Sequence, residues 1–197
     1  MLAAVILAAG ESRRMGSAKA LIPFRGISFV QHLVNATRHS RVGMTRIVLG
    51  ASADEIQPKL GIDPAWIVVN RDWQRGQLSS IQAGVRSLPE KTEGMILCPV
   101  DHPLVSGNLI SDLIKQFDSS GKLVAVPTFH GKRGHPVIFR ASLYDELLTA
   151  PPDVGAREVV WNHVQDIIEV TTEEEGVVLN LNDPEIMKKA MGSGASG

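Results

Sequence analysis

Cysteine is nearly absent from this chain of 197 residues, which contains only Cys98. A single thiol excludes an intramolecular disulfide, and no set of cysteine and histidine residues has the spacing of a zinc finger. The chain also lacks an excess of positive or negative charge, because it has 20 Lys and Arg residues and 21 Asp and Glu residues. We therefore expect no general attraction to nucleic acid or to a membrane, and we expect the protein in the reducing cytoplasm.

Long hydrophobic runs are absent as well. The chain opens with nine apolar residues, 1–9, which is far short of the roughly 20 that span a bilayer. The basic residues follow this run, whereas a signal peptide carries them before it, so we expect a buried strand. The last residues, 192–197, have the composition of a flexible tail without function. Residues 1–191 are then expected to form one domain.

Short apolar runs alternate with helical patterns along the chain. The runs at 5–7, 46–49, 66–69, 95–98 and 123–126 are typical of parallel strands that are buried on both faces. Helical periodicity occurs at 29–34, 54–60, 80–88 and 107–117. The last third predicts strands at 136–139, 166–170 and 177–181 and helices at 141–148, 156–164 and 183–191. This alternation predicts a single three-layer α/β/α domain with a mostly parallel, Rossmann-like sheet.

The segment after the first predicted strand has the composition of an anion site. Ala8, Ala9 and Gly10 let a ligand approach the backbone closely, and three cations follow at positions 13, 14 and 19. The spacing matches neither the P-loop pattern nor the dinucleotide-binding pattern. From composition alone, a polyphosphate site and a glycine-containing turn with solvated basic residues are equally good interpretations.

A carboxylate stands at the end of another predicted strand. Asp101 follows the apolar run at 95–98, and the carboxyl ends of parallel strands are where ligands bind in an open α/β sheet. Opposite a polyphosphate loop, such a carboxylate is placed to hold Mg²⁺ through its oxygen atoms. The alternative is an Asp that caps a turn or the helix that begins near Ser106.

Six segments, in order, resemble one enzyme family. Residues 7–19 match L-A-A-G-x-S-x-R-M-G-x-x-K, and residues 98–103 contain a D-x-P element. Residues 131–139 match G-x-x-G-H-P-V-x-F, and further matches lie at 76–84, 155–157 and 180–185. Together they resemble the nucleotidyltransferases related to the molybdenum cofactor cytidylyl- and guanylyltransferases. The resemblance covers about residues 2–187 and implies their fold and reaction.

The resemblance implies a Mg²⁺-dependent transfer of a nucleotidyl group from a nucleoside triphosphate to a phosphorylated acceptor, with release of diphosphate. The implied acceptor is molybdopterin carrying molybdenum, and a molybdoenzyme or its chaperone would receive the product. The implied catalytic residues are Arg14, Lys19 and Asp101. The implied nucleotide-binding residues are Leu7, Ala8, Ala9, Gly10, Arg14, Lys19, Gln77 and Ser80. The implied acceptor-binding residues are Gly134, His135 and Pro136, and the implied metal ligands are Asp101 and Asn180.

Two features of the sequence bear on whether it resembles the cytidylyltransferases or the guanylyltransferases more. The guanylyltransferases usually have glycine where this chain has Ala9, and the segment around Gly134 resembles the cytidylyltransferases, so CTP is the expected nucleotide. Asn180 and Asn182 depart from the D-x-D-T-P pattern of that branch and resemble the N-x-N-T-P of others. A neutral amide ligates Mg²⁺ more weakly than a carboxylate does.

Two other functions fit the same residues. A sugar-1-phosphate nucleotidyltransferase would use a similar loop, although the short chain leaves little room for an added acceptor domain. A non-catalytic protein that binds the nucleotide or cofactor and delivers it to an apoenzyme is favoured by the Asn180 and Asn182 pair. Release of diphosphate from a triphosphate with acceptor and Mg²⁺ separates the enzymes from the binding protein.

Overall fold

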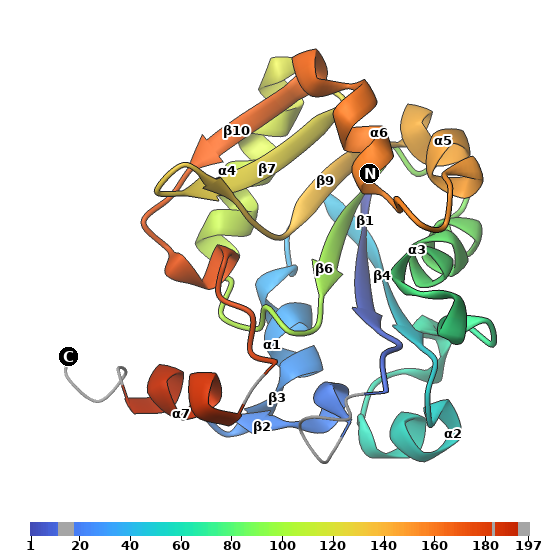
Figure 1. Cartoon of the computed structure of the whole chain (residues 1–197), viewed down its shortest axis with the longest axis vertical. Coiled ribbons are helices and arrows are strands. Elements are labelled where there is room, and N and C mark those ends of the chain that lie inside the picture. Colours follow the sequence, from blue (N-terminus) through green and yellow to red (C-terminus); the bar gives the residue numbers. More distant parts are fainter. Residues whose placement is uncertain (12–17, 183, 193–197) are drawn as a thin grey trace.

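The structure is a computed structural model that describes residues 1–11, 18–182 and 184–192 (Figure 1). Its centre is an eight-stranded sheet in the order β10-β7-β9-β6-β1-β4-β5, with β8 paired to β7 alone. The strands of this sheet are β1 (Leu2–Ala8), β4 (Val42–Leu49), β5 (Ile67–Val69), β6 (Gly94–Pro99), β7 (Val124–Phe129), β8 (Lys132–Arg133), β9 (Val137–Arg140) and β10 (Ile167–Thr171). A separate hairpin joins β2 (Pro23–Phe24) to β3 (Ile27–Ser28).

The sheet is mostly parallel, as the sequence predicts. Strand β1 pairs in parallel with β4 and β6, β4 pairs in parallel with β5, and β7 pairs in parallel with β10. Strand β9 lies between β6 and β7 and is antiparallel to both. The carboxyl ends of β5, β4, β1 and β6 therefore meet along one edge of the sheet, and the loops that follow these four strands lie together there.

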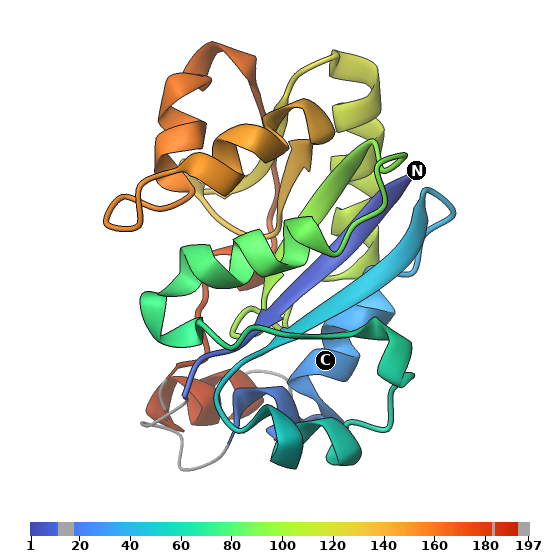
Figure 2. The same cartoon turned by 90° about the vertical axis from the view of Figure 1, so that its right-hand side faces the viewer.

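Helices cover both faces of this sheet and complete the three layers. The α-helices are α1 (Phe29–Ala36), α2 (Ala53–Ile56), α3 (Gln77–Arg86), α4 (Gly107–Ser120), α5 (Tyr144–Thr149), α6 (Arg157–Asn162) and α7 (Pro184–Gly192). The 3-10 helices are η2 (Lys19–Leu21), η3 (Gln57–Lys59), η4 (Pro64–Trp66), η5 (Trp73–Arg75), η6 (Ala141–Leu143), η7 (Val164–Asp166) and η8 (Glu175–Val177). Figure 2 shows α3 lying across one face of the sheet, with α4 behind the strands.

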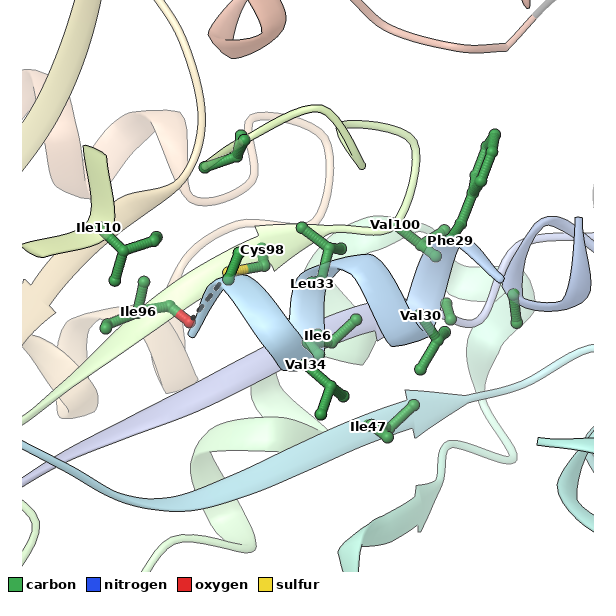
Figure 3. Packing of buried hydrophobic residues seen from close by; sticks show 14 of the residues in the cluster. Ile6, Phe29, Val30, Leu33, Val34, Ile47, Ile96, Cys98, Val100 and Ile110 are labelled. Carbon is green, nitrogen blue, oxygen red and sulfur yellow. Dashed lines mark hydrogen bonds between the residues drawn. The ribbon is translucent and has the colours of Figure 1, made fainter. Parts of the chain in front are cut away.

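Two hydrophobic cores follow from the alternation of side chains along β1. Ile6 points to the core beneath α1 and α4, whereas Val5 and Leu7 point to the core beneath α3, α5 and α6. The apolar stripe of α1 meets Ile6 and Ile47 in the first core (Figure 3). Serine side chains cap both helices of that layer, at Ser28 for α1 and at Ser106 for α4.

Cys98 is a core residue. Its side chain is buried among the apolar residues of the first core, with Sγ 3.8 Å from the carbonyl oxygen of Ile96 (Figure 3). Burial raises the pKa of this thiol to about 12. A thiolate is the nucleophilic form, so the chemistry of the site must come from other side chains.

One predicted strand is wrong. Residues 177–181 are not extended in the sheet; η8 ends at Val177 and no regular structure follows up to residue 182. Val177 and Leu181 are fully buried, so their apolar character reflects packing. The backbone of the segment bonds to other loops: the Val177 carbonyl accepts from the His135 amide, and the Leu181 amide donates to the Asp101 carbonyl.

The described part of the chain contains no helix with the length and apolar composition needed to cross a bilayer. Of the tail expected at 192–197, Gly192 instead ends helix α7, and residues 193–197 lie outside the described residues.

Candidate functional site

A cavity of about 350 Å³ opens at the edge of the sheet where the parallel strands end. Its lining residues come from the end of β1 and the loop after it, from the start of η2, from the segment that contains η5 and the start of α3, and from the end of β6 and the turn after it. Seven residues singled out from the sequence line this cavity: Leu7, Ala9, Gly10, Lys19, Gln77, Ser80 and Asp101. Ala8 does not line it, because its side chain points to the opposite face of the sheet, into the core beneath α1.

Lys19 and Asp101 face each other in the cavity. Lys19 begins η2, and its Nζ lies 3.5 Å from Oδ2 of Asp101, with about a fifth of each side chain exposed. The same ammonium group donates a hydrogen bond to Oδ1 of Asn182. Asp101 is held in turn by the C-terminal segment, since the Leu181 amide donates to its carbonyl at 2.8 Å. Segments far apart in the sequence thus place one cation and one carboxylate together.

Two side chains offer oxygen ligands that suit a hard divalent cation. Asp101 supplies a carboxylate, and Asn180, which directly precedes the residue whose amide bonds to the Asp101 carbonyl, has a buried Oδ1 without a hydrogen-bond partner in the described structure. Within the same described ranges, no group of three or more His, Cys, Asp or Glu side chains is arranged to hold a metal. A divalent cation bound by Asp101 and Asn180 would take its remaining ligands from substrate phosphates and water.

Ser80, which lines the cavity, is held by hydrogen bonds from the segment after β5. Ser80 is buried, and its hydroxyl accepts a hydrogen bond from Nδ2 of Asn70 at 3.0 Å. The same amide group donates to the hydroxyl of Ser79 at 2.9 Å. These bonds tie the end of β5 to the first turn of α3. Ser80 is therefore held in a fixed position in the first turn of α3, which also carries Gln77.

Gly134, His135 and Pro136 do not line this cavity, although His135 lies close enough to Asp101 for the two side chains to interact electrostatically. The imidazole of His135 contacts that of His102, with 4.9 Å between the ring centroids. Burial lowers the pKa of His135 to about 4, and it also lowers the pKa of His102. Both rings are neutral at neutral pH. Nδ1 of His135 is buried without a hydrogen-bond partner in the described structure.

The backbone packs tightly around these histidines. A Cβ atom at Gly134 would lie 2.3 Å from the carbonyl oxygen of Val177, so only glycine fits there. The segment 134–136 is thereby fixed against η8. Arg14 and Asp183, which the motifs also include, lie outside the described residues.

Sequence reasoning missed two residues beside the site. Trp73 lines the cavity, and His102 packs against His135. A signal for Trp73 was available: it is one of three tryptophans, and it stands in a polar loop that follows a predicted strand. His102 follows Asp101 directly, and a strand-end position of this kind places it near the same ligand.

The chain matches a family model described as the MobA-like NTP transferase domain, over residues 4–167. It is 31% identical over 191 residues to the nicotine blue oxidoreductase of Paenarthrobacter nicotinovorans, covering 87% of this chain and 88% of that protein. It is 28% identical over 122 residues to the bifunctional protein GlmU of Rubrobacter xylanophilus, covering 61% of this chain. The match spans 26% of the GlmU sequence.

Solved structures share the fold. The manganese complex of Rv0371c from Mycobacterium tuberculosis superposes with a TM-score of 0.78 at 21% identity, covering 98% of each chain. The molybdopterin-guanine dinucleotide biosynthesis protein A of Archaeoglobus fulgidus superposes with a TM-score of 0.72 at 17% identity, covering 100% of each chain. From the family model and the three-layer fold, we conclude that the chain belongs to the MobA-like NTP transferase family and is a nucleotidyltransferase.

Proposed function

We propose that this enzyme transfers CMP from CTP to the terminal phosphate of molybdopterin carrying molybdenum and releases diphosphate. The observation that carries the proposal is the cavity in which the loop of residues 7–10 meets Lys19 and Asp101. Such a cavity can hold a triphosphate beside a cation and a metal-binding carboxylate. Its position at the carboxyl edge of a parallel sheet is where open α/β folds bind nucleotides.

Lys19, together with Arg14, would bind the triphosphate. The reaction is an in-line displacement at the α-phosphorus, so the protein acts by positioning the reactants and by offsetting charge. The ammonium of Lys19 would move from Asp101 and Asn182 onto the phosphates and stabilise the departing diphosphate. The acceptor phosphate is already ionised at neutral pH and needs no general base.

Asp101 and Asn180 would hold Mg²⁺, which supplies charge neutralisation at the phosphates when it is bound. The orphaned Oδ1 of Asn180 supports this assignment, because a buried amide oxygen without a donor is costly unless a ligand satisfies it. The manganese complex of the structural relative is consistent with a divalent ion in this fold.

Gly134, His135 and Pro136 would form the acceptor side of the site. Because His135 is neutral, its free Nδ1 can take part in a hydrogen bond to the acceptor but cannot attract the acceptor's phosphate by charge. The fold shared with the archaeal molybdopterin-guanine dinucleotide protein supports a molybdopterin acceptor. Residues 1–191 would form the catalytic domain, active in the cytoplasm, with a molybdoenzyme or its chaperone as recipient.

The test is a matrix of substrates. CTP, GTP, ATP and UTP are each incubated with Mg²⁺ and either molybdenum cofactor or a panel of sugar 1-phosphates, and the products are identified by mass. We expect cytidylylated cofactor and diphosphate. A sugar nucleotide as the main product would support the sugar-phosphate alternative, to which the GlmU match points. Binding without any product would support the delivery protein.

A second candidate function is suggested by the relative whose match with this chain spans most of both sequences. That relative is named nicotine blue oxidoreductase. A polyphosphate site would also accept the diphosphate bridge of a reduced nicotinamide dinucleotide. Oxidation of NADH or NADPH with nicotine blue as acceptor, followed at 340 nm, would support this activity; absence of oxidation, together with cytidylyl transfer, would exclude it.

A further inference from the structure

Trp73 stands at the boundary between two cavities. It begins η5, in the loop between β5 and α3, and lines the cavity that contains Lys19 and Asp101. It also lines a neighbouring cavity of about 540 Å³ that Gly50, Ser52 and Asn70 border. The side chain is half-buried, so part of the indole remains open to a ligand.

Trp73 packs against Gly50, the residue that follows β4. A Cβ atom at Gly50 would lie 2.5 Å from Cβ of Trp73 and 2.6 Å from the carbonyl oxygen of Ala9. Glycine at this position lets the tryptophan and the loop after β1 come within contact distance of each other. The indole is thereby placed beside the loop proposed to bind the nucleotide.

The turn that carries Trp73 is braced by Asn70, which is 6% exposed. Its Oδ1 accepts from the Asp72 amide at 3.0 Å, while its Nδ2 donates to Ser79 and Ser80 at the start of α3. The Ser79 hydroxyl lies within donating distance of the carbonyls of Asp72, at 3.0 Å, and Gly76, at 2.8 Å. Every polar atom of the Asn70 side chain is therefore engaged in holding residues 72–80.

We infer that Trp73 is the surface on which the nucleobase of the bound triphosphate stacks, and that Asn70 is the positioning residue for it. This inference rests on the proposed function and adds a base-binding residue to it. Besides the charged Lys19 and Asp101, the lining of the cavity includes the small apolar Ala9 and the aromatic Trp73. A nucleoside triphosphate needs both kinds of partner, cations for its phosphates and a flat apolar surface for its planar ring.

Aromatic stacking contributes affinity for any base, because purines and pyrimidines both present a flat face. Its loss should weaken nucleotide binding by roughly 5- to 150-fold. It should not alter the binding of a polyphosphate that has no ring. This difference separates a stacking role from a general role in folding the loop.

The experiment compares two ligands by calorimetry, CTP and inorganic tripolyphosphate, on the full chain. Trp73→Ala should weaken CTP binding within the range given above, Trp73→Phe should restore most of it, and tripolyphosphate binding should be unchanged in both. Trp161→Phe is the matched control, because that tryptophan is 63% exposed on α6. Equal losses for CTP and tripolyphosphate would overturn the inference while leaving the proposed function standing. Failure of the wild type to bind either ligand would overturn both.

A spectroscopic readout tests the positioning role. In a variant with Trp66→Phe and Trp161→Phe, Trp73 is the remaining tryptophan of the three. CTP should quench its emission and tripolyphosphate should not. Adding Asn70→Ala should increase quenching of the free protein by acrylamide and weaken the CTP response. Emission that is unaffected by CTP would contradict stacking, and unchanged acrylamide quenching would contradict the role of Asn70.

Discussion

Two regions near Asp101, the nucleotide side with Gly10 and the histidine side with Gly134, are built in different ways. On the nucleotide side a cavity lies open, with Gly10 exposed and nothing within 4 Å of the position that a Cβ would take there. On the histidine side the chain is tightly packed, and a Cβ at Gly134 would meet the Val177 carbonyl at 2.3 Å. The first side is preformed space for a ligand. The second is a framework that holds His135 and the C-terminal segment in place.

This difference shows that a glycine in a motif can serve one of two purposes. Both Gly10 and Gly134 belong to segments that resemble the family. The surroundings of Gly10 leave room for a ligand to approach the backbone, whereas the surroundings of Gly134 leave no room for a side chain. We therefore expect changes on the first side to affect binding and changes on the second to affect stability.

The largest effect is expected at Asp101, where the two sides meet. Asp101→Asn keeps the shape of the side chain but removes its charge, so turnover should fall at least about a hundredfold while the fold is retained. Thermal unfolding and diphosphate release are measured on one preparation. Turnover close to that of the wild type at saturating Mg²⁺ would refute the metal-ligand role.

The packed side is tested by Gly134→Ala. The added methyl group has to displace the Val177 backbone, and overpacking of this kind costs about 1–3 kcal/mol. For a chain of this size, the melting temperature should fall by roughly 2–12 °C. Gly10→Ala is the matched control, with an unchanged melting temperature and weaker CTP binding. If the two variants melted alike, the contrast between the two sides would be lost.

The proposed triphosphate-binding role of Lys19 and Arg14 is tested by Lys19→Ala and Arg14→Ala. Each substitution removes one positive charge from the proposed anion site, so binding of CTP should weaken more than binding of CMP. Calorimetry with both ligands measures the difference, and Lys115→Ala, an exposed change on α4, serves as control. Equal losses for CTP and CMP would indicate that these residues act through the local structure.

The smallest effect concerns the choice of base. Ala9 lines the cavity, and we expect its methyl group to narrow the space beside the base and so to favour the single ring of cytosine. A contact of one methyl group is worth about 1–3 kcal/mol, so kcat/KM should favour CTP over GTP by roughly 10- to 200-fold. Ala9→Gly should reduce this preference in competition between the labelled nucleotides. A preference for GTP in the wild type would contradict the assignment.

The sequence predicted the sheet well, because a strand buried on both faces produces an apolar run such as that of β1. It also predicted which loops lie together, since parallel strands end at one edge. At Val177 and Leu181 it did not show whether the apolar residues belong to a strand or to a buried irregular segment. In the structure their backbones bond to His135 and Asp101. That choice depends on partners more than 40 residues away in the chain, which periodicity does not contain.

The same reason explains what was missed in the site. Lys19 and Asp101 could be anticipated from their positions after strands. For Trp73 the sequence offered its place in a polar loop after a strand, but not its packing against Gly50. The brace of Asn70 could not be anticipated, because it consists of hydrogen bonds to Asp72, Ser79 and Ser80 that only the folded chain makes. Residues that position others have no chemical signature in a single sequence.

We propose that the cavity binds CTP and that the enzyme transfers the nucleotidyl group to a phosphorylated acceptor. Diphosphate release from CTP and Mg²⁺, with and without molybdenum cofactor and combined with the mass of the product, tests this proposal. We expect one diphosphate for each cytidylylated cofactor, and no release when the acceptor is omitted. Diphosphate release that is independent of the acceptor, or an unmodified cofactor after CTP has been consumed, would contradict it.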